Sequence, residues 1–410
     1  MSQRRVDSVE TSYGWVVAVA SMAIMGIGFG APYVVVVGLK PIAAEFAWPR
    51  SIPSLATASA YIGTGLGGIA MGWWADRVGV MWPALLGSLM VGLGLFVASG
   101  SNDMWQLYLS HGLLIGLIGN AGTFSPLMSN VTRWFDRRMG VAVALVASGQ
   151  SIAGAIWPPV FRYSIDLVGW RQTMIWFGLF SVATMAPLSL LLRRRPPVPT
   201  MRSVSSDPRH GEPVLGLPAN LVLGMLCLAI VGCCVAMAMP MVHTVAYCSD
   251  LGYLPARGAE MLSLLLASAF LSRLFWGRLS DQVGGLKTIL IGASCQAVAL
   301  SLYLVVDGEI ALYALSAGFG LAFGGIVPAY ALAARELFPS SQAGWRIGTI
   351  YLFGTIGMAL GGWLGGFIYD LTANYRPAFA VGVLFNLLNL ALLGLLVARQ
   401  SRPRLDPAMT

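Results

Sequence analysis

Charged side chains are scarce in this sequence. Asp, Glu, Lys and Arg make up 10% of its 410 residues, while apolar residues make up 57%. Soluble domains carry about 25% charged residues, so the composition excludes a soluble globular protein. It indicates a chain that crosses a lipid bilayer many times.

Paired cysteines and clustered metal ligands are also missing. The five cysteines lie in or beside apolar runs, without the spacing of a disulfide framework or a zinc site. No Ser/His/Asp group lies in register for catalysis, so we expect no metal, no cofactor and no enzymatic activity. The net charge of +8 is not accompanied by a basic aromatic module. Nucleic acid is therefore excluded as a partner, and the arginines are expected to set membrane topology instead.

Twelve apolar segments are long enough to cross a bilayer, which takes about 20 such residues. An even number of spans places both termini on one side. Eighteen Lys and Arg residues fall on that side and six on the other, and Arg273 belongs to neither. Because positive charge collects on the cytoplasmic side, both termini are predicted to be cytoplasmic. The expected fold is an all-α membrane protein with spans near residues 14–39, 52–74, 81–100, 104–130, 138–162, 171–192, 218–247, 257–280, 286–306, 309–334, 344–369 and 375–398.

The chain divides into two similar halves. Residues 193–217 are rich in proline, serine and arginine and are expected to form a cytoplasmic linker between six-helix bundles at 1–192 and 218–410. The segment GWWADRVG at 72–79 returns as GRLSDQVG at 277–284, 205 positions later (281 − 76). The triplet GWR at 169–171 returns as NYR at the same offset. Duplicated halves are known in secondary transporters, where the substrate site lies between them.

The repeated loops carry glycines and a carboxylate suited to a tight turn between helices. Their pattern resembles the signature loop of the major facilitator superfamily, which implies that fold and a role in cytoplasmic gating. The residues concerned are Gly72, Asp76, Arg77, Gly79, Gly277, Asp281 and Gly284. The first copy departs from the family in having Val80 and Met81 where a basic residue is usual.

One arginine stands alone inside an apolar span. Arg273 lies eight residues before Asp281, about 12 Å into the membrane at 1.5 Å per residue. A central arginine costs about 2.5 to 3.5 kcal/mol on insertion scales. Two interpretations are open: it pairs with a carboxylate or helix end inside the bundle, or it binds a substrate anion with its guanidinium fork. The spans contain almost no carboxylate, which favours the anion.

Several segments look like those of the monocarboxylate transporters and their bacterial relatives, including the oxalate/formate antiporter. They are YGWVVAVAS at 13–21, LKPIAAEFAWPRS at 39–51, the stretch 133–159, HTVAYCSDLG at 243–252 and SRLFWGRLSD at 272–281. The resemblance implies that Arg273 binds the substrate carboxylate and that Phe323 limits substrate size. Tyr33 falls where animal members have a lysine, and Ala269 where they have an aspartate. Both family residues take part in proton coupling, so the route of the proton here is left open.

Other polar and aromatic residues within the spans are candidates for lining the substrate cavity. Each has a competing interpretation as a packing residue or as a bond between helices. They are Asn120, Phe124, Gln150, Tyr330 and Tyr351. His243 is a candidate for proton coupling because histidine titrates near neutral pH, although it is also suited to bond a neighbouring helix.

These features predict a multi-pass transporter of the inner (plasma) membrane, monomeric as is usual in the superfamily. Its expected substrates are small carboxylate anions such as lactate and pyruvate, and by resemblance the coupling ion is a proton moving with the substrate. An oxalate/formate-type exchanger is the main alternative. The family's exchange design uses a second basic residue in the eleventh span, and the segment TIYLFGTIGMALGGWLGG at 349–366 contains none. A multidrug exporter is less favoured because it would more often carry an intramembrane carboxylate.

Overall fold

The computed structural model describes residues 10–135, 138–196, 214–338 and 340–400. These ranges are almost entirely helical, with an isolated β-bridge between Val214 and Leu217. The helices in chain order are α1 (Ser12–Gly28), α2 (Ala31–Val37), α3 (Leu39–Glu45), α4 (Ser51–Val78), α5 (Met81–Ser99), α6 (Met104–Leu109), the π-helix η1 (Ser110–Asn120), α7 (Ala121–Val131), α8 (Met139–Leu190), the 3₁₀ turn η2 (Leu191–Arg193), α9 (Ala219–Asp250), α10 (Pro255–Val283), α11 (Gly285–Leu302), α12 (Glu309–Phe323), α13 (Ile326–Leu337), α14 (Ser340–Thr372) and α15 (Arg376–Gln400).

Ten helical stretches of the described chain are long and apolar enough to cross a membrane. One of them, Val141–Arg193, runs through two of the predicted spans, because α8 continues across a break at Gly169. There the backbone adopts φ 80° and ψ 164°, which glycine accepts readily. The 28-residue α4 covers a further predicted span but is not among the ten, since its glycine, serine and threonine content lowers its hydropathy.

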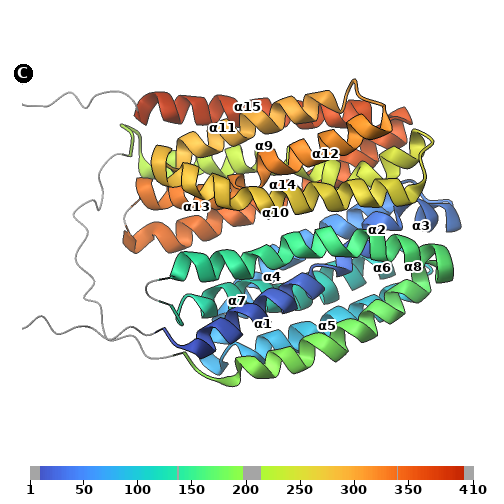
Figure 1. The fold of residues 1–410 in the computed structure, drawn as a ribbon, viewed down its shortest axis with the longest axis horizontal. Helices are drawn as coiled ribbons and strands as arrows, with labels where there is room; N and C mark the ends of the chain where they lie inside the picture. Colours follow the sequence, from blue (N-terminus) through green and yellow to red (C-terminus); the bar gives the residue numbers. More distant parts are fainter. Residues whose placement is uncertain (1–9, 136–137, 197–213, 339, 401–410) are drawn as a thin grey trace, which may run out of the picture.

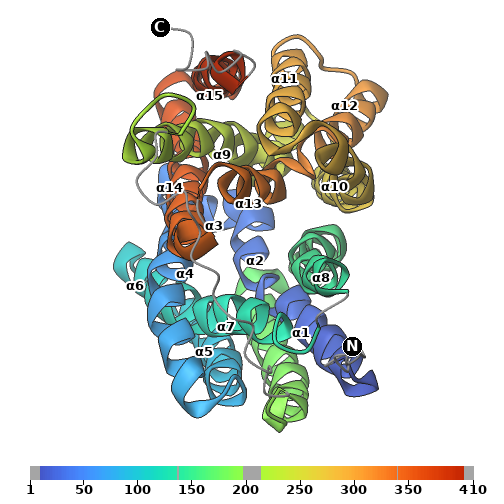
Figure 2. The ribbon, with the colours of Figure 1, turned by 90° about the vertical axis from the view of Figure 1, so that its left-hand side faces the viewer.

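Figures 1 and 2 show the helices in two stacked groups. The first group, here called the first half, holds α1 to α8, and the second half holds α9 to α15. Within the halves α1 and α5 pack on α8, and α14 and α15 pack on α9. Between the halves, α4 packs on α14 and α10 packs on α8. Any site between the halves is therefore bordered by these two helix pairs.

Glycines permit close approaches between helix backbones within each half. A Cβ added at Gly357 or Gly361 of α14 would lie 2.7 Å or 2.5 Å from a backbone oxygen of α9. Gly63 and Gly67 of α4 meet the backbone of η1 in the same way. Four-residue spacing of glycine brings helix backbones together where no apolar driving force acts between helices in lipid.

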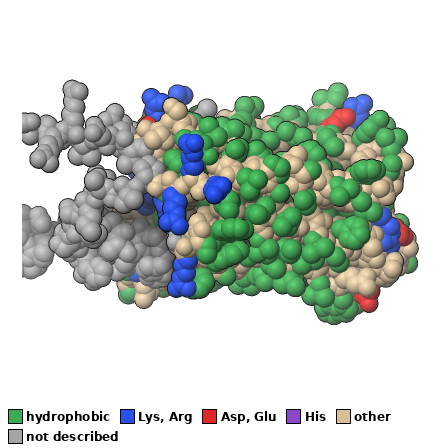
Figure 3. All heavy atoms as spheres, turned by 90° about the horizontal axis from the view of Figure 1, so that it is seen from below, with side chains coloured by type: hydrophobic (Ala, Val, Ile, Leu, Met, Phe, Trp, Pro, Cys, Tyr) green, Lys and Arg blue, Asp and Glu red, His purple; other side chains and the backbone are tan. Residues whose placement is uncertain are grey.

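The outer surface matches a membrane environment. Figure 3 shows a broad belt of apolar side chains, with Lys and Arg gathered at the two ends. Large apolar side chains are exposed in the spans: Ile69 of α4 is 70% exposed and Leu271 of α10 is 69% exposed. We call the end at which α1 begins and α15 ends the terminal end, and the opposite one the distal end (Figure 1).

Candidate functional site

Arg273 lies on the face of α10 that is turned toward the first half. The face carrying Leu265, Ala269 and Trp276 packs into α12: the Trp276 indole donates a hydrogen bond to the Leu321 carbonyl at 2.7 Å. Leu266, about 100° further round the helix, lies against Gly154 of α8. Arg273 follows Leu266 by seven residues, which is two helical turns, so the two side chains share a face.

The guanidinium of Arg273 has no protein partner among the described residues. Its side chain is partly buried, and the buried Nε has no hydrogen-bond acceptor. No ion pair joins it to a described carboxylate. The internal pairing that the sequence left open is therefore not found in the described chain. An unpartnered cation in an apolar bundle is chemically suited to hold an anion.

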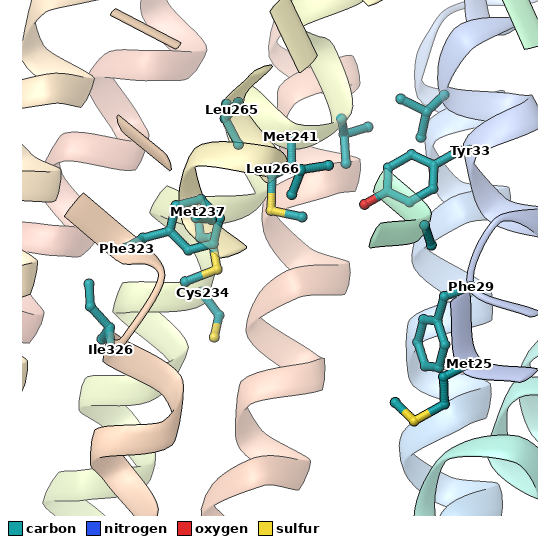
Figure 4. Packing of buried hydrophobic residues seen from close by; sticks show 14 of the residues in the cluster. Met25, Phe29, Tyr33, Cys234, Met237, Met241, Leu265, Leu266, Phe323 and Ile326 are labelled. Carbon is teal, nitrogen blue, oxygen red and sulfur yellow. The ribbon is translucent and has the colours of Figure 1, made fainter. Parts of the chain in front are cut away.

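Across from this face, the first half presents a row of apolar and aromatic side chains. Met25, Phe29 and Tyr33 lie one above the other, opposite a group from the second half that includes Met237, Leu266 and Phe323 (Figure 4). The Tyr33 hydroxyl is directed toward Leu266 in that view, and a Cβ added at Gly154 would lie 2.7 Å from it. Tyr33 is 8% exposed. It therefore lies at the meeting of the two halves, on the distal side of Arg273.

At the distal end, three charged side chains tie the halves together. Arg50 of the first half donates two hydrogen bonds to the two carboxylate oxygens of Asp250, at 2.5 Å and 2.8 Å. Lys40 binds the same carboxylate at 2.7 Å and donates to the Ser249 hydroxyl at 2.8 Å. A fork of two parallel bonds is the strongest geometry for such a pair. We call Lys40, Arg50, Asp250 and Asp370 the distal latch.

Asp370 completes the latch from α14. Its two oxygens accept the backbone N–H groups of Arg50 and Ser51, at 2.8 Å and 2.9 Å, at the start of α4. A carboxylate at a helix N-terminus satisfies unpaired donors and interacts well with the helix dipole. Burial would lower the pKa of the Arg50 guanidinium, but hydrogen bonds with Asp250 and Tyr375 raise it overall, so Arg50 remains charged. The latch thus joins both halves through two carboxylates of the second half.

His243 lies close to the distal latch and packs against Tyr375, which is bonded to Arg50. The ring is fully buried, its centroid lies 5.1 Å from that of Tyr375, and Tyr375 in turn accepts a hydrogen bond from Arg50 at 3.2 Å. His243 Nε2 lies 2.8 Å from the Gly362 carbonyl, while Nδ1 has no partner. A carbonyl can only accept, so Nε2 carries the proton and Nδ1 keeps a free lone pair. The histidine bonds a neighbouring helix and also retains a basic nitrogen.

A family model describes the whole of this architecture. The model of the Major Facilitator Superfamily matches residues 14–253 and again residues 224–409. The chain belongs to the Major Facilitator Superfamily. The second match begins within the second half, in keeping with the internal repeat at 72–79 and 277–284.

Curated relatives of this superfamily member include named monocarboxylate transporters. Monocarboxylate transporter 13 of Bos taurus is 28% identical over 395 residues, which cover 93% of this chain and 88% of that protein. Monocarboxylate transporter 11 of Homo sapiens is 27% identical over 406 residues, covering 92% and 82%. The resemblance inferred from the sequence segments is therefore confirmed, and the chain is a transporter rather than an enzyme.

Solved structures of a transporter homologue share the fold. A bacterial homologue of the human lysosomal transporter Spinster, in an inward-facing and occupied conformation, has a TM-score of 0.74 at 16% identity. The match covers 95% of this chain and 98% of that one. The same homologue in its inward-facing unoccupied conformation gives a TM-score of 0.69.

The two loops that carry the superfamily signature turn at glycine, as predicted. Gly79 and Gly284 end α4 and α10 with φ of 95° and 85°. The side chains of Asp76 and Asp281 lie outside the described part of the structure, so their role as latches stays a prediction. Nearby, Glu336 accepts the Gly285 N–H with both oxygens, at 2.9 Å and 3.2 Å, and caps α11.

The remaining residues of the loops are Gly72, Gly277 and Arg77. A Cβ added at Gly72 would lie 3.3 Å from the Ser125 hydroxyl oxygen, and one added at Gly277 would meet open space. Arg77 is exposed, with its guanidinium carbon 3.6 Å from the centre of the Trp73 ring. None of these three makes a contact between the halves in the described chain, so their part in gating also remains a prediction.

Three of the other predicted residues lie near the meeting of the halves. Phe124 packs edge-on against Phe29 with ring centroids 5.7 Å apart, and Figure 4 places Phe323 beside Met237. Gln150 precedes Gly154 by one turn on the same face of α8. Since α8 and α10 run antiparallel here, Gln150 and Arg273 both lie on the terminal side of the contact between Gly154 and Leu266.

Three others lie away from Arg273 or are engaged elsewhere. The Tyr330 hydroxyl is fully buried and donates to Asn389 at 3.0 Å, which bonds α13 to α15. Tyr351 reaches the Val327 carbonyl at 3.5 Å. Asn120 is 1% exposed, with Oδ1 facing Gly28 inside the first half. The geometry of Tyr330 favours the packing interpretation, and we leave it out of the proposed site.

Sequence reasoning missed the distal latch. Lys40, Arg50 and Asp250 all stand in the segments that carry the monocarboxylate-transporter resemblance, at 39–51 and 243–252. A signal was present, because charges of opposite sign occur at the distal ends of spans in both halves. Their pairing across 200 residues was not visible in the pattern of either segment.

Proposed function

We propose that this protein is a secondary active transporter of small monocarboxylates of the lactate and pyruvate type, coupled to protons by symport. The observation that carries the proposal is the unpartnered guanidinium of Arg273 on the α10 face turned toward the first half. One cation there matches one carboxylate. The apolar side chains of Phe29, Met237 and Phe323 suit the short carbon chain of such a substrate. The names of the curated relatives support the same substrate class.

We further propose twelve spans arranged as bundles at 1–192 and 218–410, joined by a linker at 193–217. The break at Gly169 in α8 and the length of α4 support this number. The terminal end is then cytoplasmic, as the distribution of Lys and Arg predicts, and the protein is a monomer of the inner (plasma) membrane. The distal latch faces the exterior in this topology.

Transport would proceed by alternating access. With Lys40 and Arg50 bound to Asp250, the path to the exterior is closed, and the substrate exchanges between Arg273 and the cytoplasm. Opening to the exterior requires these ion pairs to separate while the halves rock about the site. A proton and a monocarboxylate together carry no net charge, so the membrane potential would not drive the step.

The anion exchanger remains the second candidate, and the count of cations argues against it. From residue 347 to the end of α14 the sequence holds no Lys or Arg to neutralise a second carboxylate. A multidrug exporter is less favoured, because the spans offer no central carboxylate that would attract a cationic substrate.

The direct test is uptake of radiolabelled lactate and pyruvate into proteoliposomes under an inward proton gradient. We expect uptake that depends on the gradient and is competed by unlabelled pyruvate but not by oxalate. Oxalate competition without proton dependence would instead identify an exchanger. Absence of uptake for every monocarboxylate tried, with or without the gradient, would overturn the proposal.

The role of His243 can be separated from the substrate site. His243→Gln places an amide N–H near the position of Nε2, which keeps a donor for the Gly362 carbonyl, but it removes the free basic nitrogen. Proton-driven uptake should therefore fall to the level measured without a gradient, while exchange of internal for external substrate persists. His111→Asn is the matched control, since His111 is equally buried but bonds within the same helical segment to the Leu107 carbonyl. Undiminished gradient-driven uptake in the His243 variant would assign this residue to packing alone.

A further inference from the structure

A cavity separate from the Arg273 site lies at the terminal end of the first half. Its volume is about 490 Å³, and it is formed by the end of α4, the start of α5, the end of α7 and the residues around η2. It therefore lies at the membrane surface on the side proposed to be cytoplasmic, apart from Arg273 and from the distal latch. The proposed transport function makes no use of it.

The lining of this cavity is strongly basic. Five of the residues that line it are arginines, and none of its described lining residues is acidic: Arg77, Arg133, Arg193, Arg194 and Arg195. Within the described chain, the three consecutive arginines that follow α8 form no ion pair with a carboxylate. The positive charge of these three arginines, which no described carboxylate pairs with, attracts an anion.

A buried amide adds a second, independent indication. Asn130 lines the cavity and is 7% exposed, and its Nδ2 has no hydrogen-bond acceptor. A buried donor without an acceptor costs about 1 to 3 kcal/mol unless a ligand or water satisfies it. In the wall of this arginine-lined cavity, the Asn130 amide is placed to donate a hydrogen bond to an oxygen of a bound anion.

The aromatic residues around the cavity indicate the depth in the bilayer at which the cavity opens. Trp82 lines it and is 51% exposed, and Trp73 is 57% exposed beneath the guanidinium of Arg77. Exposed indoles of this kind favour the headgroup region of a bilayer. On the other side, Arg194 lies over the Tyr13 ring at 4.3 Å, and the Tyr13 hydroxyl donates to the Leu191 carbonyl. The arginines are thus held at headgroup depth.

We propose that this cavity binds the phosphate group of an anionic phospholipid headgroup. Guanidinium forks match phosphate oxygens, and the cytoplasmic leaflet supplies anionic lipid at this depth. A free phosphate has the same recognised chemistry, but the exposed indoles favour a ligand that arrives with a lipid. The bound headgroup would fix the first residues of the linker to the first half, because Arg193 to Pro196 form one wall of the cavity.

The test uses thermal unfolding of the full-length protein in detergent, followed by tryptophan fluorescence, with phosphatidylglycerol, phosphatidylcholine or sodium phosphate at matched ionic strength. Phosphatidylglycerol should raise Tm and phosphatidylcholine should not, because a ligand that binds only the folded state stabilises it. The triple variant Arg193→Gln, Arg194→Gln, Arg195→Gln should need roughly tenfold more phosphatidylglycerol for half of the shift. A matched triple variant in the second half, Arg278→Gln, Lys287→Gln, Arg335→Gln, removes the same charge from exposed positions and should respond like the native protein.

A second variant keeps all arginines in place. Ser129 is exposed and lines the cavity, so Ser129→Glu adds a carboxylate there and should weaken the phosphatidylglycerol effect similarly. If sodium phosphate alone gives a Tm shift with the same dependence on these variants, the site takes free phosphate and the lipid proposal is overturned. Equal shifts with phosphatidylglycerol in native protein and both cavity variants, or equal shifts with the two lipids, would overturn it as well.

Discussion

Arg273→Gln should reduce carboxylate uptake by about one to two orders of magnitude. The reason is the loss of charge-assisted hydrogen bonds to the substrate carboxylate, worth about 1.5 to 3 kcal/mol. Arg273→Lys should retain part of the activity, because it keeps the charge but not the fork. Initial rates of lactate and pyruvate uptake into proteoliposomes under a proton gradient measure the effect.

Two controls distinguish a binding role from a structural one. Arg278→Gln removes an exposed arginine of the same helix and should leave uptake near the native level. The Tm of Arg273→Gln should equal or exceed that of the native protein, since no described residue pairs with the guanidinium and a central charge is costly in a bilayer. Undiminished uptake, or a large fall in Tm together with lost uptake, would show that Arg273 has a structural role rather than a binding role.

Asp250→Asn should shift the protein toward a state open at the distal end. The change leaves Arg50 and Lys40 without their shared carboxylate, which lies 2.5 Å and 2.7 Å away in the closed state. These side chains are between 14% and 34% exposed, so we expect a shift of about 1 to 2 kcal/mol, or about 5- to 30-fold in the ratio of closed to open protein.

Distances between spin labels at Ala44→Cys and Leu254→Cys measure this shift. Both positions are exposed at the distal end, one on each half, and Cys295→Ser supplies the background because the other cysteines are buried. The distance distribution should gain a longer component in Asp250→Asn. Glu260→Gln removes a distal carboxylate whose partners among the described residues, Arg257 and Tyr313, belong to its own half, so it should leave the distribution unchanged. The same distribution in native protein and Asp250→Asn would show that the latch does not hold the halves.

Helical spans were predictable from this sequence because each depends on about 20 neighbouring residues. The break at Gly169 and the turns at Gly79 and Gly284 also follow from local sequence. Arg273 stood out because a lone charge in an apolar run has a large local cost.

The hydrogen-bond partners of individual side chains were not predictable, because they depend on the rotation of each helix and on residues far apart in the chain. Asp370 accepts from Arg50 across 320 positions, and Tyr330 finds Asn389 across 59. Nothing in the sequence around Tyr330 separates a hydroxyl that faces a cavity from one that bonds a neighbouring helix. For His243, the structure is compatible with both interpretations of the sequence, a helix-to-helix bond and proton coupling. The ring bonds the Gly362 carbonyl and still keeps one nitrogen free.

Three joints between consecutive helices share one backbone conformation: Gly79, Gly169 and Gly284 have φ between 80° and 95° and ψ between 157° and 164°. At Gly79 and Gly169 no atom lies within 4 Å of the position that a Cβ would take, so room for a side chain is not what excludes other residues. Other residues are excluded by the handedness of the backbone. The mirror image of this conformation is the ordinary extended region of L-residues, so the conformation itself suits a D-residue or glycine. A D-alanine would fit these joints where an L-alanine is strained. The three helix pairs are thus joined by corners whose handedness glycine accepts and an L-residue with a side chain does not accept without strain.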